Sequence, residues 1–336
     1  MPTDNEFTKV LGWPGYRVYR HHIDEKAKRL KLWVRRKRGN RILRCPSCGR
    51  RVQDIHEVYE REVRDLPCFE FQTTVIIELY RIRCPDCGVK AEKVAALPSK
   101  ASYSKRFEDA VGQACESAAA RQVARRVGLA ESTVRAIDLR YLERWEARRR
   151  QPPLRQMGVD EIYRGKSDKF LTVVCNLETS EPLWFGKERK KETLDDFFRS
   201  QLVSRQRKRI EAACVDMWEP FRKSLEQWAP QCKIVYDKYE GAMLNYLQKW
   251  MDQLKWQRLE PFEDLAAMLL KHVDGIVNYC RTKVRFGVVE AVNGNIRMLI
   301  NRGRGYKNLR YLLLKAKRLA VTNMEFIAVC SVKKAA

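Results

Sequence analysis

Two short cysteine motifs of the same form constrain this chain more than any other feature. They read Cys45-Pro-Ser-Cys48-Gly and Cys84-Pro-Asp-Cys87-Gly. A C-x-x-C pair on a tight turn offers two thiolates to one ion, and zinc takes four such ligands in a tetrahedron. The glycine after each pair lets the backbone turn so that amide groups approach the sulfur atoms. The motifs therefore predict one structural Zn²⁺ held by Cys45, Cys48, Cys84 and Cys87.

The alternative is a redox dithiol, which needs only one such pair and usually opens a helix in a βαβ unit. That context is absent from the sequence. No apolar run of membrane-spanning length is present, and the N-terminal residues MPTDNEFTKV lack a signal-peptide profile. We therefore expect a cytoplasmic protein without membrane contact. In that reducing compartment the other seven of the eleven cysteines would be small core residues: Cys68, Cys115, Cys175, Cys214, Cys232, Cys280 and Cys330.

The charge balance favours a polyanionic partner. The 336 residues include 67 Lys and Arg against 42 Asp and Glu, a formal net charge of +25. Both halves of the chain carry the excess, so contact with nucleic acid along the whole molecule is the leading interpretation. A ribosome-associated or merely basic protein is the alternative. Since hydrophobic residues make up 45% of the chain, at least one sizeable core can form.

The pattern of residues divides the chain into three expected parts. Residues 1–98 form a β region with the zinc ribbon: the first 40 residues alternate between apolar and basic side chains, and residues 71–83 between the two cysteine motifs resemble a strand. Residues 99–150 are helical, rich in alanine and arginine, and end in a proline-containing linker over 148–154. Residues 151–325 form an α/β region that finishes in helices. The predicted class is multidomain α+β.

The helical part contains the pattern of a helix-turn-helix over residues 121–140. Ala124 is small where two helices would cross, Gly128 permits a left-handed turn, and Leu129 plugs the core. Val134 and Ile137 would face inward from the second helix, and residues 102–119 would supply the supporting first helix. A generic helical hairpin is the alternative. The side chains expected to meet base edges or phosphates are Glu131, Ser132, Thr133, Arg135 and Arg140.

In the α/β part, strands are expected over 156–163, 169–177, 182–186, 210–218 and 233–237, with helices over 193–202 and 220–228. From about Gly241 onward the pattern is helical. The order predicts an RNase-H-like sheet, in which the first and fourth strands are neighbours.

Three acids in this part form a candidate catalytic triad. Asp160 lies inside the first predicted strand, where a carboxylate is costly unless it is exposed, paired or bound to a metal. Asp216 closes the fourth strand, and Glu290 lies on a helix that would pack across the sheet. Three such oxygen donors can hold two Mg²⁺ or Mn²⁺ ions for in-line displacement at a phosphodiester. Each acid taken singly is more often a surface or strand-end residue.

Together these features resemble the bacterial insertion-sequence transposases of the ISL3 family. The resemblance runs from the first cysteine motif to about Val321 and is most specific at GVDE (158–161), VDMW (215–218) and the stretch 288–312. It implies a DDE-type enzyme with Asp160, Asp216 and Glu290 as metal ligands, acting on double-stranded DNA as a homo-oligomer at the nucleoid. The zinc and helix-turn-helix parts would recognise terminal inverted repeats. Further residues that the resemblance places near DNA are Asn293, Arg302, Arg304 and Lys307.

The chain departs from the family pattern in one respect. The family carries a long helical insert between an Asp-Lys-Tyr or Asp-Lys-Phe motif and the helix bearing the glutamate. Here residues 233–239 run almost at once into 241–256, and Glu240 stands where a histidine often follows. We therefore expect an internal deletion that weakens catalysis. The alternative function is a non-catalytic zinc and helix-turn-helix DNA-binding protein, such as a decayed transposase copy.

Overall fold

The computed structural model describes residues 3–38, 42–98, 102–165, 170–216, 218–236 and 287–335, with Met268, Asn278, Thr282, Val284 and Arg285. The motif at 237–240 and most of the helical stretch expected from Gly241 lie outside the described residues. The chain divides into two compact units, Met1–Tyr141 and Leu142–Ala336, and each is described by itself. The three-part division at 98 and 150 stays a prediction.

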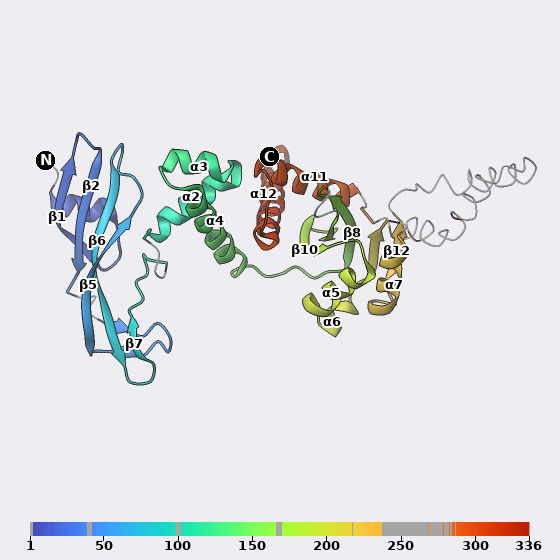
Figure 1. Cartoon of the computed structure of the whole chain (residues 1–336), viewed down its shortest axis with the longest axis horizontal. Helices are drawn as coiled ribbons and strands as arrows, with labels where there is room; N and C mark the ends of the chain where they lie inside the picture. Colours follow the sequence, from blue (N-terminus) through green and yellow to red (C-terminus); the bar gives the residue numbers. More distant parts are fainter. Residues whose placement is uncertain are drawn as a thin grey trace, which may run out of the picture. The chain divides into compact units, whose positions relative to one another are not determined.

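A five-stranded sheet forms the base of the first unit (Figure 1). Its strands lie in the order β1-β2-β6-β5, and β7 pairs with the C-terminal part of β6. Their bounds are β1 Tyr16–Asp24, β2 Arg29–Arg36, β5 Ile55–Arg64, β6 Gln72–Cys84 and β7 Gly88–Ala91. Strands β2 and β6 run parallel, and the other pairs are antiparallel. The strands expected within the first 40 residues are present as β1 and β2, and the strand expected over 71–83 is present as β6, whereas β5 was not predicted.

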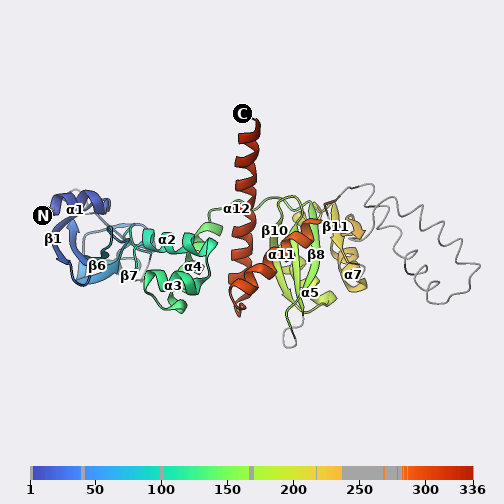
Figure 2. The same ribbon diagram turned by 90° about the horizontal axis from the view of Figure 1, so that it is seen from above.

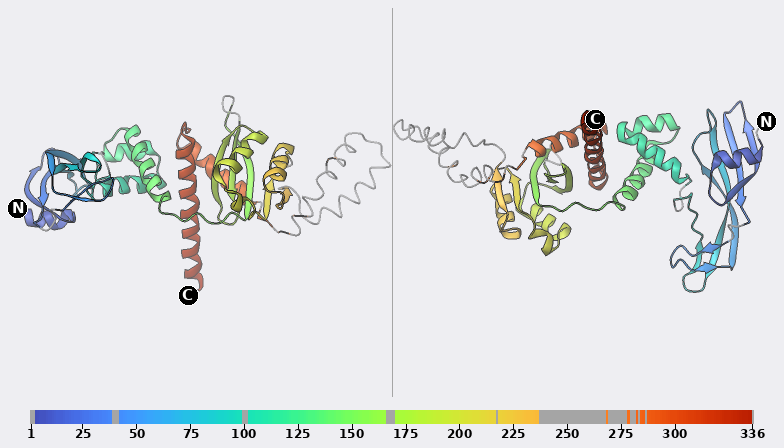
Figure 3. Two further views of the ribbon diagram at one scale, coloured as in Figure 1. Left: turned by 90° about the horizontal axis from the view of Figure 1, so that it is seen from below. Right: turned by 180° about the vertical axis from the view of Figure 1, so that it is seen from behind.

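Residues 4–11 correct the expectation that the first 40 residues are strands, because they form helix α1 (Asp4–Leu11). A capping box starts the helix: the Thr3 hydroxyl accepts from the Glu6 N–H, and the Glu6 carboxylate accepts from the Thr3 N–H at 2.6 Å. Phe7 and Leu11, four residues apart, then bury themselves against the sheet core. Figure 3 shows α1 lying against one face of β1 and β2.

Three helices complete the first unit: α2 Lys105–Ser117, α3 Ala120–Val127 and α4 Glu131–Glu146. The residues that make their common core include Phe107, Val111, Val123, Val134 and Ile137. Helices α2 and α4 cross closely at Gly112, where an added Cβ would lie 2.2 Å from the Tyr141 ring.

Asp65, directly after β5, joins the sheet to these helices. Its carboxylate is buried and accepts from Trp13 Nε1 (3.1 Å), Ser104 Oγ (2.5 Å) and both Nε and Nη2 of Arg106 (2.7 and 2.5 Å). Arg106 also donates to the backbone oxygen of Leu11 at 2.8 Å. A buried charge is tolerated when it is paired and hydrogen-bonded in this way. One side chain thus connects the end of α1, the sheet and the start of α2.

The second unit contains another five-stranded sheet, in the order β10-β9-β8-β11-β12. The bounds are β8 Gln156–Tyr163, β9 Phe170–Asn176, β10 Glu181–Lys187, β11 Ala212–Val215 and β12 Lys233–Tyr236. Strands β8, β9 and β10 are antiparallel neighbours, whereas β11 runs parallel to both β8 and β12. The expected adjacency of the first and fourth strands of this region is therefore confirmed.

Helices cover both faces of this sheet. Helix α5 (Lys191–Gln201), the short α6 (Ser204–Arg207) and α7 (Glu219–Trp228) accompany one face, where Leu194, Phe198 and Phe221 share a buried core with Met157 and Val159 of β8. Figure 2 shows α11 (Gly287–Arg302) crossing the strands obliquely and α12 (Leu309–Ala335) beside β10.

Residues 149–154 of the expected linker have no regular structure, as predicted. They nevertheless pack on the second unit. Arg149 donates to both carboxylate oxygens of Glu181 at 2.8 Å, and Leu154 belongs to the buried core.

We predict that Asp65→Asn lowers the free energy of unfolding by about 3 kcal/mol, because it leaves the Arg106 guanidinium without its buried counter-charge. Urea denaturation of the full chain measures this. Glu57→Gln is the matched control, since Glu57 and its partner Arg81, at 3.1 Å, are both half exposed, and its cost should stay below about 1 kcal/mol. Equal losses in the two variants would contradict the role given to Asp65.

Candidate functional site

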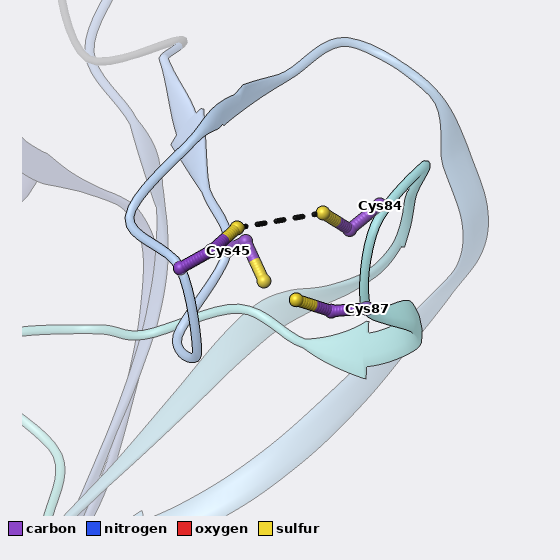
Figure 4. Close-up of side chains that lie close together, drawn as sticks. Cys45, Cys84 and Cys87 are labelled. Carbon is purple, nitrogen blue, oxygen red and sulfur yellow. Dashed lines mark hydrogen bonds between the residues drawn. The ribbon is translucent and has the colours of Figure 1, made fainter.

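The four motif cysteines converge at one end of the β5–β6 hairpin. Cys45 and Cys48 lie in the turn between the short strands β3 (Leu43–Arg44) and β4 (Arg51–Val52). Cys84 is the last residue of β6, and Cys87 lies in the turn between β6 and β7. All four sulfur atoms lie within 4.8 Å of one another. The Sγ atoms of Cys48 and Cys84 are 3.6 Å apart, close to the ~3.8 Å edge of a tetrahedron with Zn–S bonds of ~2.3 Å. Figure 4 shows the labelled sulfurs directed toward a common centre.

The backbone around the cluster favours the thiolate of Cys45, whereas the side chain of Cys48 and burial raise the pKa of Cys87 to about 12. The backbone N–H of Cys48 donates to the sulfur of Cys45 and, as the largest influence, lowers the pKa of Cys45 to about 6. Gly49 and Gly88 have φ of +74° and +73°, the left-handed conformation that the tight turns require. Only a small apolar group, with Leu43, Val52 and Ile82 at its centre, packs around the cysteines. The ribbon therefore depends on the metal more than on its own core.

The helix-turn-helix forms as expected. Gly128 follows α3 in the left-handed conformation (φ +62°), and Val134 and Ile137 of α4 are fully buried. Helix α4 begins at Glu131, so Ser132 and Thr133 lie in its first turn, exposed and half exposed.

The two arginines of α4 differ in their surroundings. Arg135 pairs with Glu131 at 2.7 Å, and both side chains are more than a third exposed. Arg140 instead donates to the fully buried Glu108 of α2 at 2.5 Å, which gives its guanidinium a role in holding the helices together. Contact between these side chains and DNA stays a prediction.

Asp160 and Asp216 lie abreast on neighbouring parallel strands. Strands β8 and β11 pair in a register that puts Val159 opposite Val215, and each aspartate follows directly. Because the strands are parallel, both carboxylates come at the same level of the sheet. The structure thus brings together two of the three acids that the sequence suggested.

Helix α11 crosses the sheet beside Asp160. Gly158 makes this close approach possible, since an added Cβ would lie 2.6 Å from Val289. Asn293, which is buried, donates its Nδ2 to Asp160 Oδ2 at 2.6 Å. Its Oδ1 is also buried and has no hydrogen-bond partner among the described residues.

Glu290 lies one helical turn before Asn293 on α11 and is exposed. It forms no hydrogen bond or ion pair with the described residues. In the part of the chain that the structure describes, the carboxylates of Asp160, Asp216 and Glu290 do not form a group of donor atoms as compact as the four cysteines.

Two residues that the sequence analysis did not select occupy this region. Arg189, after β10, pairs with Glu161 and, at 3.1 Å, with Asp216, while its guanidinium lies 4.4 Å from the Trp218 ring. Burial and the nearby carboxylates of Asp160 and Asp216 raise the pKa of Glu161 to about 7, against the opposite influence of Arg189. The sequence could have indicated Glu161, because it directly follows Asp160. It gave no means of selecting Arg189, which lies among other charged residues over 187–192.

The basic residues after Asn293 surround the turn between α11 and α12. Arg304 and Lys307 are exposed, and Arg304 has a φ of +53°. Gly303 packs against the buried Tyr306 ring, where a Cβ would come within 2.5 Å. Arg302, the last residue of α11, is half buried. The turn is tight and presents two cations to solvent.

Comparison with known families decides the classification. A model described as a transposase matches residues 157–240 and 239–316, and a model described as the zinc-finger of transposase IS204/IS1001/IS1096/IS1165 matches 43–87. A third, the helix-turn-helix domain of transposase family ISL3, matches 92–142. The chain belongs to the ISL3 family of transposases. The resemblance found in the sequence is thereby confirmed, as are the zinc ribbon, the helix-turn-helix and the α+β class.

Curated relatives of this ISL3-family chain agree. It is 30% identical over 248 residues to the transposase for insertion sequence element IS1001 of Bordetella parapertussis, covering 73% of this chain and 60% of that protein. The transposase for IS1557 of Mycobacterium tuberculosis is 28% identical over 165 residues, 48% of this chain and 37% of that protein. The chain thus spans 60% or less of the length of the relatives it matches. Among the described residues, no helix has the length and apolar character needed to cross a membrane.

We predict one zinc per chain, lost in Cys84→Ser because three thiolates and a hydroxyl bind the ion far more weakly. Elemental analysis of the purified ISL3-family chain measures the metal. Cys68→Ser, a half-buried cysteine outside the cluster, is the matched control and should retain stoichiometric zinc. Retention of zinc and an unchanged melting profile in Cys84→Ser would place the metal elsewhere.

Proposed function

We propose that this chain is a DDE-type transposase that binds transposon ends and catalyses metal-dependent cleavage and strand transfer of double-stranded DNA. The observation that carries the proposal is the pairing of β8 with β11, which sets Asp160 beside Asp216 under the helix that bears Asn293 and Glu290. We further propose that the chain acts as a homo-oligomer on DNA in the bacterial cytoplasm, at the nucleoid.

The residues around Asp160 fit divalent metal ions. Hard cations such as Mg²⁺ and Mn²⁺ prefer carboxylate and amide oxygens, and this region offers Asp160, Glu161, Asp216 and the buried, unpartnered Oδ1 of Asn293. Arg189 supplies positive charge to both Glu161 and Asp216. In our proposal Asp160, Asp216 and Glu290 hold the ions, and Asn293 orients the Asp160 carboxylate. When bound, the ions would activate the attacking water or 3′-hydroxyl and stabilise the leaving oxygen.

Glu290 reaches this site on a helix whose approach depends on the segment before it. The family match breaks into two pieces that meet at residues 239–240, where the sequence suggested a missing insert. We propose that this shorter connection leaves Glu290 loosely placed relative to the two aspartates. Positioning errors of about 1 Å can cost about a hundredfold in rate, so catalysis would be weak.

The alternative, a non-catalytic zinc and helix-turn-helix protein, is not favoured. The match to the transposase model extends over both aspartates and Glu290, and all three acids are retained.

DNA recognition is proposed for the exposed first turns of α4, with Arg304 and Lys307 contacting the phosphate backbone from the turn before α12.

We predict that Arg135→Ala weakens binding to the cognate transposon end more than to random duplex, because loss of a base contact removes discrimination of about 1–3 kcal/mol. Fluorescence anisotropy with both duplexes measures this, and the random duplex is the internal control. Equal losses on the two duplexes would mean that Arg135 contacts only phosphate. Binding that did not change with salt would contradict DNA binding altogether.

We predict weak strand transfer by the unmodified chain, with residual nicking abolished by Asp160→Ala, Asp216→Ala or Glu290→Ala. Labelled end DNA with Mg²⁺ or Mn²⁺ provides the assay, and Asp196→Ala, an exposed acid of α5, is the matched control that should keep wild-type nicking. A second readout is the rise in melting temperature caused by Mn²⁺, which the first two variants should lose. Nicking that survives all three substitutions would contradict the triad. Robust strand transfer would show that the short connection is functional.

A further inference from the structure

The outer face of strands β1 and β2 carries cations without carboxylate partners. Helix α1 covers the inner face, where Val18, Leu32 and Val34 are buried. On the outer face Arg17, Arg20 and Arg35 are exposed. None of these three guanidinium groups forms an ion pair with any of the residues that the structure describes.

The arrangement of these arginines is costly for the isolated fold. Arg17 and Arg35 are direct cross-strand partners in the antiparallel register of β1 and β2, so both project on the same face. Like charges placed directly opposite each other destabilise a sheet, and opposite charges there would stabilise it. Such a local violation of sheet design is expected where a surface serves a function.

Aromatic side chains hold two of the arginines in place. The Arg20 guanidinium lies 4.6 Å from the centre of the Trp33 ring, and that of Arg35 lies 4.9 Å from the Tyr19 ring. A guanidinium stacked on a ring loses little further freedom when it binds an anion, and its outward N–H groups remain available. The face is therefore both charged and ordered before any partner arrives.

Four other cations of this sheet and its β1–β2 turn have acidic partners. Ion pairs join Lys28 to Glu70 at 2.8 Å, Lys31 to Glu62 at 3.7 Å and Arg81 to Glu57 at 3.1 Å, and Arg36 pairs with Glu92. Acids thus accompany these four basic residues, whereas no described acid pairs with Arg17, Arg20 or Arg35.

We propose that this face, defined by Arg17, Arg20, Arg35, Tyr19 and Trp33, binds the phosphate backbone of duplex DNA. Guanidinium groups bind phosphate oxygens in bidentate fashion, and three of them without counter-charges match a polyanion. The face lies outside the three family matches, which begin at residue 43. It would add a sequence-independent contact that is distinct from the zinc ribbon and from α4. The proposal rests on the proposed function, since it takes DNA as the partner.

The test is titration of the full, zinc-loaded chain with a random-sequence duplex at several salt concentrations. Arg17→Gln combined with Arg35→Gln should weaken binding and make the log–log salt slope shallower by about 1.8, at ~0.9 for each phosphate contact. The control combines Lys28→Gln, in the β1–β2 turn, with Arg81→Gln, in β6, and so removes two cations that have acidic partners. Its slope should stay at the wild-type value.

Arg17→Glu separates folding from binding. A glutamate at position 17 faces Arg35 directly, so the melting temperature should be unchanged or higher while DNA affinity falls. Wild-type binding with unchanged slopes in these variants would overturn this proposal alone. Loss of affinity for single-stranded RNA but not for duplex would overturn the choice of DNA. Absence of salt-dependent DNA binding in the wild-type chain would overturn the proposed function as well.

Discussion

Electrostatic repulsion among Asp160, Glu161 and Asp216 is the constraint around which the second unit is arranged. Strand pairing between β8 and β11 brings the two aspartates to one level, and Glu161 adds a third carboxylate that is mostly buried. Arg189, stacked on Trp218, offsets part of the charge, and the Asn293 amide donates to Asp160. Burial and repulsion together raise the pKa of Glu161 to about 7. A region with this excess of carboxylates is suited to cations.

In the first unit, two buried carboxylates are paired with arginines. Asp65 and Glu108 are buried carboxylates, and each receives an arginine from the neighbouring helices, Arg106 and Arg140. These pairs fix α2 and α4 relative to the sheet, because a buried charge left alone would be far more costly than the pair. The helix-turn-helix is therefore held to the sheet by specific charges as well as by apolar packing. Arg140 illustrates how a residue expected to face DNA can have a structural partner.

The presence or absence of acidic partners also distinguishes one basic surface of the chain from another. A net charge of +25 by itself identifies no binding face. Many arginines and lysines of this chain have acidic partners nearby, and their net effect at a distance is small. The cations of the β1–β2 face lack such partners among the described residues, and those of the α11–α12 turn, Arg304 and Lys307, are exposed. The distribution of partners, more than the count of cations, points to the surfaces that meet a polyanion.

The sequence by itself determined the four clustered cysteines of the zinc ribbon, the helix-turn-helix and the positions of the strands in the second unit, because these are local patterns. Four cysteines in two tight turns, Gly128 between two amphipathic helices, and alternation along the strands each leave a signature in consecutive residues. Helix α1 was missed because its capping box is short and the strand signal that follows it is strong. Only the tertiary structure decided the rest, namely the Asn293–Asp160 contact, the position of Arg189 between Glu161 and Asp216, and the pairing of Arg140 with Glu108. These contacts join residues far apart in the chain, and which partner a charged side chain finds depends on burial and on sheet register, neither of which a local pattern contains.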